Sequence, residues 1–111
     1  PDDLGEIAGE LWDDTAAHIA EMGLLTPSTR DRFVELCRAY GRMVELGADV
    51  EQGGMTWTDA DGVMHRRQAA LERDALGWRV LELLREFGMT PRSRYELVTA
   101  GRLDPKWLPG R

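Results

Sequence analysis

Few side chains in this sequence have the types and spacing that catalysis or metal binding requires. The two histidines, His18 and His65, lie far apart in the chain, and no Cys or His cluster has metal-ligand spacing. Cys37 falls on an apolar helical stripe, which favours a packed thiol over a nucleophile. No GxxxxGK[ST] loop is present to hold ATP phosphates. The sequence therefore predicts a non-catalytic protein without a metal ion or cofactor.

The chemistry that remains is phosphate binding by arginine. Residues 1–64 carry 14 acidic and 4 basic side chains, whereas residues 65–111 carry 6 acidic and 10 basic ones. The second half has the charge to contact nucleic acid, although a solvated surface without a partner is the alternative explanation. Basic side chains at helix starts are of particular interest, because backbone amides there also favour phosphate. The candidate DNA-binding residues are Arg30, Arg32, Arg66, Arg67, Arg92 and Arg94.

Two similar phrases, at 23–30 and 88–94, must position these arginines. Each reads Gly, apolar residue, Thr-Pro, hydroxyl residue and Arg. Glycine can end a helix in the left-handed conformation, Thr can cap the next helix, and Pro fits the first helical position. Both phrases therefore predict corners between helices.

Apolar periodicity predicts the helices that meet at the first corner. A 3.6-residue period runs from Leu4 to Met22, and a second helix follows Thr26-Pro27 and ends near Gly47. The apolar residues of the second helix fall on one face. Because the corner between the two helices is short, we expect them to form an antiparallel hairpin. The residues of that face are Phe33, Leu36, Cys37, Tyr40 and Val44.

The period changes between residues 50 and 65. Residues 55–58 favour an extended strand, and residues 59–62 are typical of a turn, which predicts a small β-hairpin or an ordered loop. Asp59, Asp61 and Gly62 share part of a calcium-loop pattern. The further oxygen ligands and the closing Glu are missing, so a turn is the better interpretation.

A long third helix, at about 67–87, carries two apolar stripes. One stripe runs from Leu76 to Phe87, and the other comprises Leu71, Ala75 and Trp78. A surface helix of a monomer usually needs one stripe, so the second predicts contact with a neighbouring copy. The alternative is a central helix that is wrapped on all sides within one copy.

Residues 101–111 differ from the helical domain expected at 1–100. Two prolines interrupt the segment, and its apolar content is too low for it to fold alone. We expect a flexible C-terminal tail after a short fourth helix. The alternative is a short docking peptide with Trp107 and Leu108 as its anchors.

With 111 residues and 42% hydrophobic content, the chain is one small domain. Its single cysteine excludes an intrachain disulfide and favours a reducing compartment. No apolar run approaches 18 residues, so no membrane partner is expected.

The ordered series of motifs resembles the small terminase subunits of tailed bacteriophages. The resemblance covers roughly residues 4–97 and is closest to the group whose members end in a Gly-Leu-Thr-Pro-x-Ser-Arg phrase. One departure is His65-Arg66-Arg67-Gln68, where members of this group often have a Pro at the start of the third helix. The residues that carry the resemblance are Trp12-Asp13, 23–27, Asp31, Leu36-Cys37, Tyr40, Gly53-Gly54 and 87–94.

The resemblance implies a mostly α-helical protein that forms a homo-oligomeric ring. Such a protein recognises viral double-stranded DNA and presents it to the large terminase subunit, which supplies the ATPase and nuclease, in the host bacterial cytoplasm. An adaptor or regulator that oligomerises and binds only protein is the alternative. Scattered, paired arginines would favour the adaptor, and one continuous basic surface would favour DNA.

Overall fold

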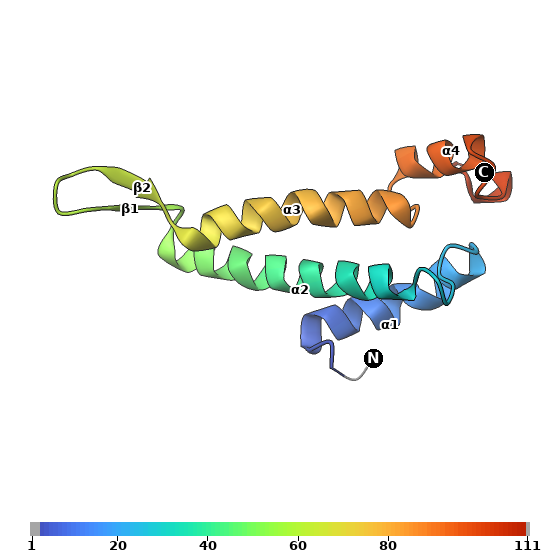
Figure 1. Cartoon of the computed structure of the whole chain (residues 1–111), viewed down its shortest axis with the longest axis horizontal. Coiled ribbons are helices and arrows are strands. Elements are labelled where there is room, and N and C mark those ends of the chain that lie inside the picture. The colour runs from blue at the N-terminus through green and yellow to red at the C-terminus, as the bar shows by residue number, and fades with distance from the viewer. Residues whose placement is uncertain (1–2, 111) are drawn as a thin grey trace.

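The computed structural model describes residues 3–110, which are mostly helical, as predicted. Four α-helices, a two-stranded hairpin and a short 3-10 helix follow one another along the chain (Figure 1). The elements are α1 (Glu6–Glu21), α2 (Arg30–Gly53), β1 (Thr56–Thr58), β2 (Met64–Arg66), α3 (Gln68–Glu86), α4 (Pro91–Thr99) and η1 (Pro105–Trp107).

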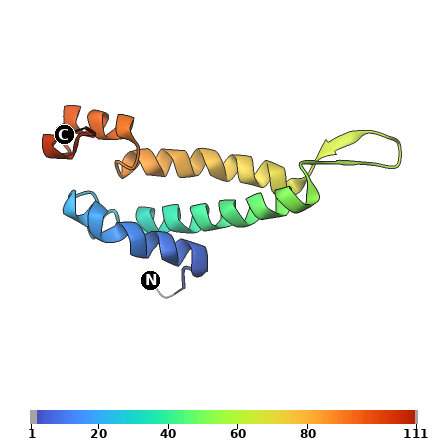
Figure 2. The ribbon, with the colours of Figure 1, turned by 180° about the vertical axis from the view of Figure 1, so that it is seen from behind.

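Helix α2 is the central helix, with α1 on one side and α3 on the other (Figures 1 and 2). Phe33 of α2 joins both sides, because its ring meets Trp12 of α1 edge-on at 5.3 Å and Phe87 at the end of α3 at 5.1 Å. Leu36 and Cys37 are also fully buried. The helix covered on two sides is thus α2, and α3 keeps one side open.

The prediction that the second helix ends near Gly47 is wrong, because α2 continues to Gly53. Leu46 and Val50 are buried, and their packing outweighs the roughly 1 kcal/mol that a helical glycine costs. Apolar positions of α2 repeat with alternating spacings of three and four residues, which is the seam of an antiparallel helix pair. These positions are Leu36, Ala39, Met43, Leu46 and Val50.

Val44 does not lie on a buried face as predicted, since it is exposed. Helix α1 covers only the first half of α2. Near the start of α1, a β-carbon at Gly41 would lie 3.2 Å from the backbone nitrogen of Ala8, so the two backbones almost touch there. Val44 lies beyond that crossing and has no helix above it.

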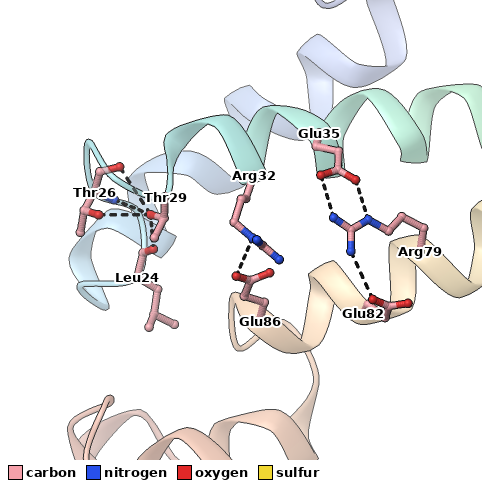
Figure 3. Close-up of polar contacts among 8 residues, drawn as sticks. All are labelled: Leu24, Thr26, Thr29, Arg32, Glu35, Arg79, Glu82 and Glu86. Carbon is pink, nitrogen blue, oxygen red and sulfur yellow. Dashed lines mark hydrogen bonds and ion pairs between the residues drawn. The ribbon is translucent and has the colours of Figure 1, made fainter.

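The two Thr-Pro corners have different caps. At the second, Thr90 is the N-cap: its Oγ1 accepts from the Ser93 amide at 3.2 Å, and Pro91 opens α4 as expected. At the first, the N-cap is Thr29, not Thr26. The Thr29 hydroxyl accepts from the Thr26 amide at 2.9 Å and donates to the carbonyl of Leu24 at 2.8 Å, which closes a turn before the helix (Figure 3).

Both corners lie at the same end of the molecule and pack together. Gly88 has φ of +65°, and a β-carbon there would lie 3.2 Å from Cδ1 of Leu24 and 3.2 Å from Cδ1 of Leu97. Glycine is therefore required at position 88 for both its conformation and its small size.

The predicted β-hairpin is confirmed. Strands β1 and β2 are antiparallel, with Trp57 opposite His65, and every residue in both strands is exposed. The hairpin projects beyond the ends of α2 and α3 (Figure 1). Asp59 closes the turn, because its Oδ1 accepts from the amides of Asp61 at 2.9 Å and Val63 at 3.0 Å.

The C-terminal segment folds back on the corner end. Leu103 is buried in the core, and the ring of Trp107 meets His18 of α1 edge-on at 5.3 Å. The Arg94 side chain donates to the carbonyls of Gly88 at 2.8 Å and Trp107 at 3.3 Å. The division of the chain into a helical domain at 1–100 and a C-terminal tail at 101–111 stays a prediction.

Candidate nucleic-acid and oligomer interfaces

One edge of the α2–α3 pair is closed by ion pairs. Glu35 accepts two hydrogen bonds from Arg79, and one heptad further along α2, Arg42 donates to Glu72 at 3.2 Å (Figure 3 shows the first pair). The hydrogen bond from Arg79 lowers the pKa of Glu35, and the hydrogen bond to Glu72 raises the pKa of Arg42. Residues seven positions apart lie on one edge of a helix, so these pairs form a ladder.

Three of the six candidate arginines belong to such pairs. Arg32 lies 2.7 Å from Glu86 across α2 and α3, and Arg66 lies 2.8 Å from Asp74. Arg67 also closes the end of α2, since its guanidinium donates to Asp49 Oδ1 at 2.7 Å and to the carbonyl of Gly54 at 2.8 Å.

The other three candidates lie near the corners. The guanidinium of Arg30 lies 5.7 Å from the centre of the Trp12 ring. Arg92 has an 89% exposed side chain, and among the described residues its ion pair is with Glu96, one turn along α4, at 3.2 Å. Such exposed pairs contribute only about 0.3–0.5 kcal/mol, so Arg92 can turn to another anion. Arg94 is held by backbone carbonyls.

The six arginines therefore form no continuous surface on one copy. Arg66 is the last residue of β2 and Arg67 follows it, whereas the other four lie at the corner end, separated by the length of α2, about 36 Å for its 24 residues. Sequence reasoning missed two further cations at the corner end. Arg102 lines a cleft with Thr26 and Thr29, and Lys106 lies over the Trp107 ring.

A second edge of α3 is apolar and open. All three residues of the second stripe are exposed, Leu71 by 45% and Trp78 by 72%. Beside Trp78 runs an open groove of about 700 Å³. Its lining residues are Met43, Arg73, Asp74, Gly77, Trp78 and Leu81.

The potentially reactive side chains are not brought together. Cys37 is buried, and burial raises the pKa of its thiol to about 11. His65 donates from Nε2 to Asp59 at 2.7 Å on the hairpin, far from His18 on α1. The hydrogen bond from His65 lowers the pKa of Asp59. Within residues 3–110 no group of three His, Cys, Asp or Glu side chains could hold a metal ion.

The model of the family "Phage terminase, small subunit" matches residues 8–102, most of the chain. The chain belongs to the phage terminase small-subunit family. The resemblance drawn from the ordered series of motifs is thus confirmed. No curated protein and no solved structure matches this small terminase subunit.

Membership of this family implies that the small terminase subunit acts in phage DNA packaging, a process that involves DNA and the large subunit. The family is in general regulatory or DNA-binding rather than catalytic. Among the described helices, none combines the length and apolar character needed to cross a bilayer.

Proposed function

We propose that this small terminase subunit recognises viral double-stranded DNA and presents it to the large subunit without catalysing a reaction itself. It does so as a homo-oligomeric ring in the host bacterial cytoplasm. The observation that carries the proposal is the open apolar edge of α3 in a chain whose family acts in packaging. Trp78 is the most exposed large apolar residue on that edge. Exposed apolar surface of this kind is typical of a subunit contact in a copy that has not assembled.

Among the six candidate arginines, Arg30 and Arg92 are our leading DNA contacts, because within residues 3–110 neither is held by a carboxylate of another element or by backbone carbonyls. Arg102 and Lys106 extend the same basic end. A ring repeats each weak contact around its axis, so a few cations per copy sum to a strong, salt-sensitive grip on DNA.

Trp107 and Leu108 are our candidate docking residues for the large subunit. Both are half-buried, so each keeps part of its apolar surface open while the C-terminal segment holds its shape. The hydrogen bond from the Arg94 side chain to the carbonyl of Trp107 holds this segment in one orientation.

Anisotropy of a fluorescent DNA duplex, titrated with the protein at several salt concentrations, tests the DNA proposal. We expect binding to weaken steeply with salt, and Arg30→Ala with Arg92→Ala to flatten that slope. Arg66→Ala with Arg67→Ala is the matched double variant at the hairpin end. If the slope is the same for wild type and both double variants, DNA does not bind through these arginines.

The second candidate is a helical adaptor that binds only protein. The pairing of Arg32, Arg66 and Arg67 with carboxylates favours it, because paired cations are less free to meet phosphate. Wild-type protein that forms a ring but leaves the anisotropy of DNA unchanged at low salt would support the adaptor and overturn the DNA proposal.

A further inference from the structure

The single copy exposes more surface than a compact protein of its mass. Its accessible surface is 7201 Å², whereas a compact 12.5 kDa protein exposes roughly 6,200 Å². Its radius of gyration is 17.4 Å, against about 13 Å for a compact chain of this length. The excess, roughly 1,000 Å², is close to the area of about 800 Å² that one partner contributes to a standard protein–protein interface.

One exposed apolar surface lies on the β-hairpin. The register places Met55, Trp57, Val63 and His65 on the same face, and we call these four residues the hairpin face. Trp57 is 52% exposed and Val63 53%, and the Trp57 ring stacks on His65 at 4.7 Å. Because an isolated two-stranded hairpin is only marginally stable in water, this face is suited to packing against another surface.

The second surface is the α3 stripe of Leu71, Ala75 and Trp78. Arg66 lies on the face of the hairpin opposite to the hairpin face, and it reaches Asp74, which lies between Leu71 and Trp78 on α3. The hairpin face and the α3 stripe of one copy thus point to different sides. Two unlike surfaces on different sides suit a head-to-tail contact between copies.

We propose that the hairpin face of one copy packs on the α3 stripe of the next copy. This inference rests on the proposed ring and names the surfaces that close it. The hairpin is long enough to cover the stripe: from residue 55 to the turn it spans roughly 17 Å, whereas the helix from Leu71 to Trp78 spans about 11 Å.

Charge also agrees with this occupant. Asp61, at the tip of the hairpin, has no ion pair within residues 3–110. Arg85, one heptad beyond Trp78 on α3, likewise has none in that range. A hairpin that lies along the stripe with its tip towards the end of α3 brings these two opposite charges together.

A complementation experiment tests this contact. Trp57→Glu disables the hairpin face, and Trp78→Glu disables the α3 stripe, because each puts a charge into an apolar contact. Both side chains are exposed, so each variant keeps its fold, as circular dichroism and thermal melting will check. Native mass spectrometry should find each variant monomeric, and an equimolar mixture should form a heterodimer through the one contact whose two surfaces are intact.

Tyr95→Glu is the matched control, because Tyr95 is an exposed aromatic residue on α4, outside both surfaces. It should assemble like wild type. Asp61→Arg, at the exposed tip, should weaken assembly without changing the circular dichroism spectrum. A mixture of the two Trp variants that stays monomeric overturns this inference, as does normal assembly of Trp57→Glu. A wild-type protein that is itself monomeric overturns the proposed ring, whereas a wild-type ring with failed complementation overturns only this contact.

Discussion

Arg79 of α3 donates two parallel hydrogen bonds to Glu35 of α2, from Nε to Oε2 at 2.5 Å and from Nη2 to Oε1 at 2.8 Å. One heptad along, the pair of Arg42 and Glu72 has the opposite polarity. A slip of one heptad between the helices would place Glu35 opposite Glu72. The alternating ladder therefore specifies the register of the α2–α3 pair as well as joining the helices.

The ladder predicts the outcome of charge reversal. Glu35→Arg should lower the melting temperature by several degrees, because it places two guanidinium groups face to face. Adding Arg79→Glu should restore most of the loss, since the pair is re-formed with reversed polarity. Thermal melts of the two single variants and the double variant form a double-mutant cycle, and additive losses in that cycle would contradict the pairing.

The same pair predicts a pH dependence. Arg79 holds the pKa of Glu35 below its ordinary value of 4.5 in the folded protein, so the unfolded chain binds the proton more readily. The stabilisation by Glu35 is present above pH 4.5 and is lost as the pH falls through the lower folded value. The difference in melting temperature between wild type and Glu35→Gln should therefore shrink between pH 7 and pH 3. Glu10→Gln, which removes an exposed carboxylate from α1, is the control for the loss of a surface charge.

Two helical glycines predict opposite effects of the same substitution. Gly77→Ala should stabilise the fold by about 0.5–1 kcal/mol, because the new β-carbon meets only Met43 Sδ, at 4.0 Å, and alanine favours helix. Gly41→Ala should destabilise it by about 1–3 kcal/mol, since its β-carbon would press on the Ala8 backbone and push α1 away from α2. Urea unfolding measures both, and a destabilised Gly77→Ala would be the contrary result.

The thiol of Cys37 should be inert in the folded protein. Burial hides it and raises its pKa to about 11, so little thiolate forms near neutral pH. A disulfide reagent at pH 8 should react slowly with native protein and at once in denaturant. Cys37→Ser should cost about 1–3 kcal/mol if its hydroxyl is left without a partner. Rapid reaction of the native thiol would show that this part of the core opens readily.

The fold was predictable where local chemistry decides it. The Gly-Thr-Pro phrases mark both corners, and the turn residues at 59–62 mark the hairpin, because the relevant bonds join near neighbours in the chain. The predicted end of α2 near Gly47 and the predicted burial of Val44 were wrong. Both depend on which helix packs against α2 and on how much of its length that helix covers. The position of Leu103 in the core depends in the same way on distant packing.

The candidate sites divide along the same line. The stripe of Leu71, Ala75 and Trp78 could be recognised from helical spacing, and it is exposed on α3. The partners of Arg32 and Arg67 could not be, because Glu86 and Asp49 reach them only through the register of two helices distant in sequence. The sequence feature that indicates this register is the pair of opposite charges at Glu35 and Arg42, seven residues apart on one edge of α2.

The two ends of α2 are covered by different numbers of elements, and this difference affects how readily each end unfolds locally. At the corner end, residues of α1, α3, α4 and the C-terminal segment share one core with Phe33, whereas among the described residues at the hairpin end the buried apolar side chains are Leu46, Val50 and Ala70, between two helices. Backbone amides near Val50 should therefore exchange with deuterium faster than those near Phe33. A neighbour that covers the hairpin end would slow this exchange, so the exchange rate at one end of α2 becomes a gauge of assembly.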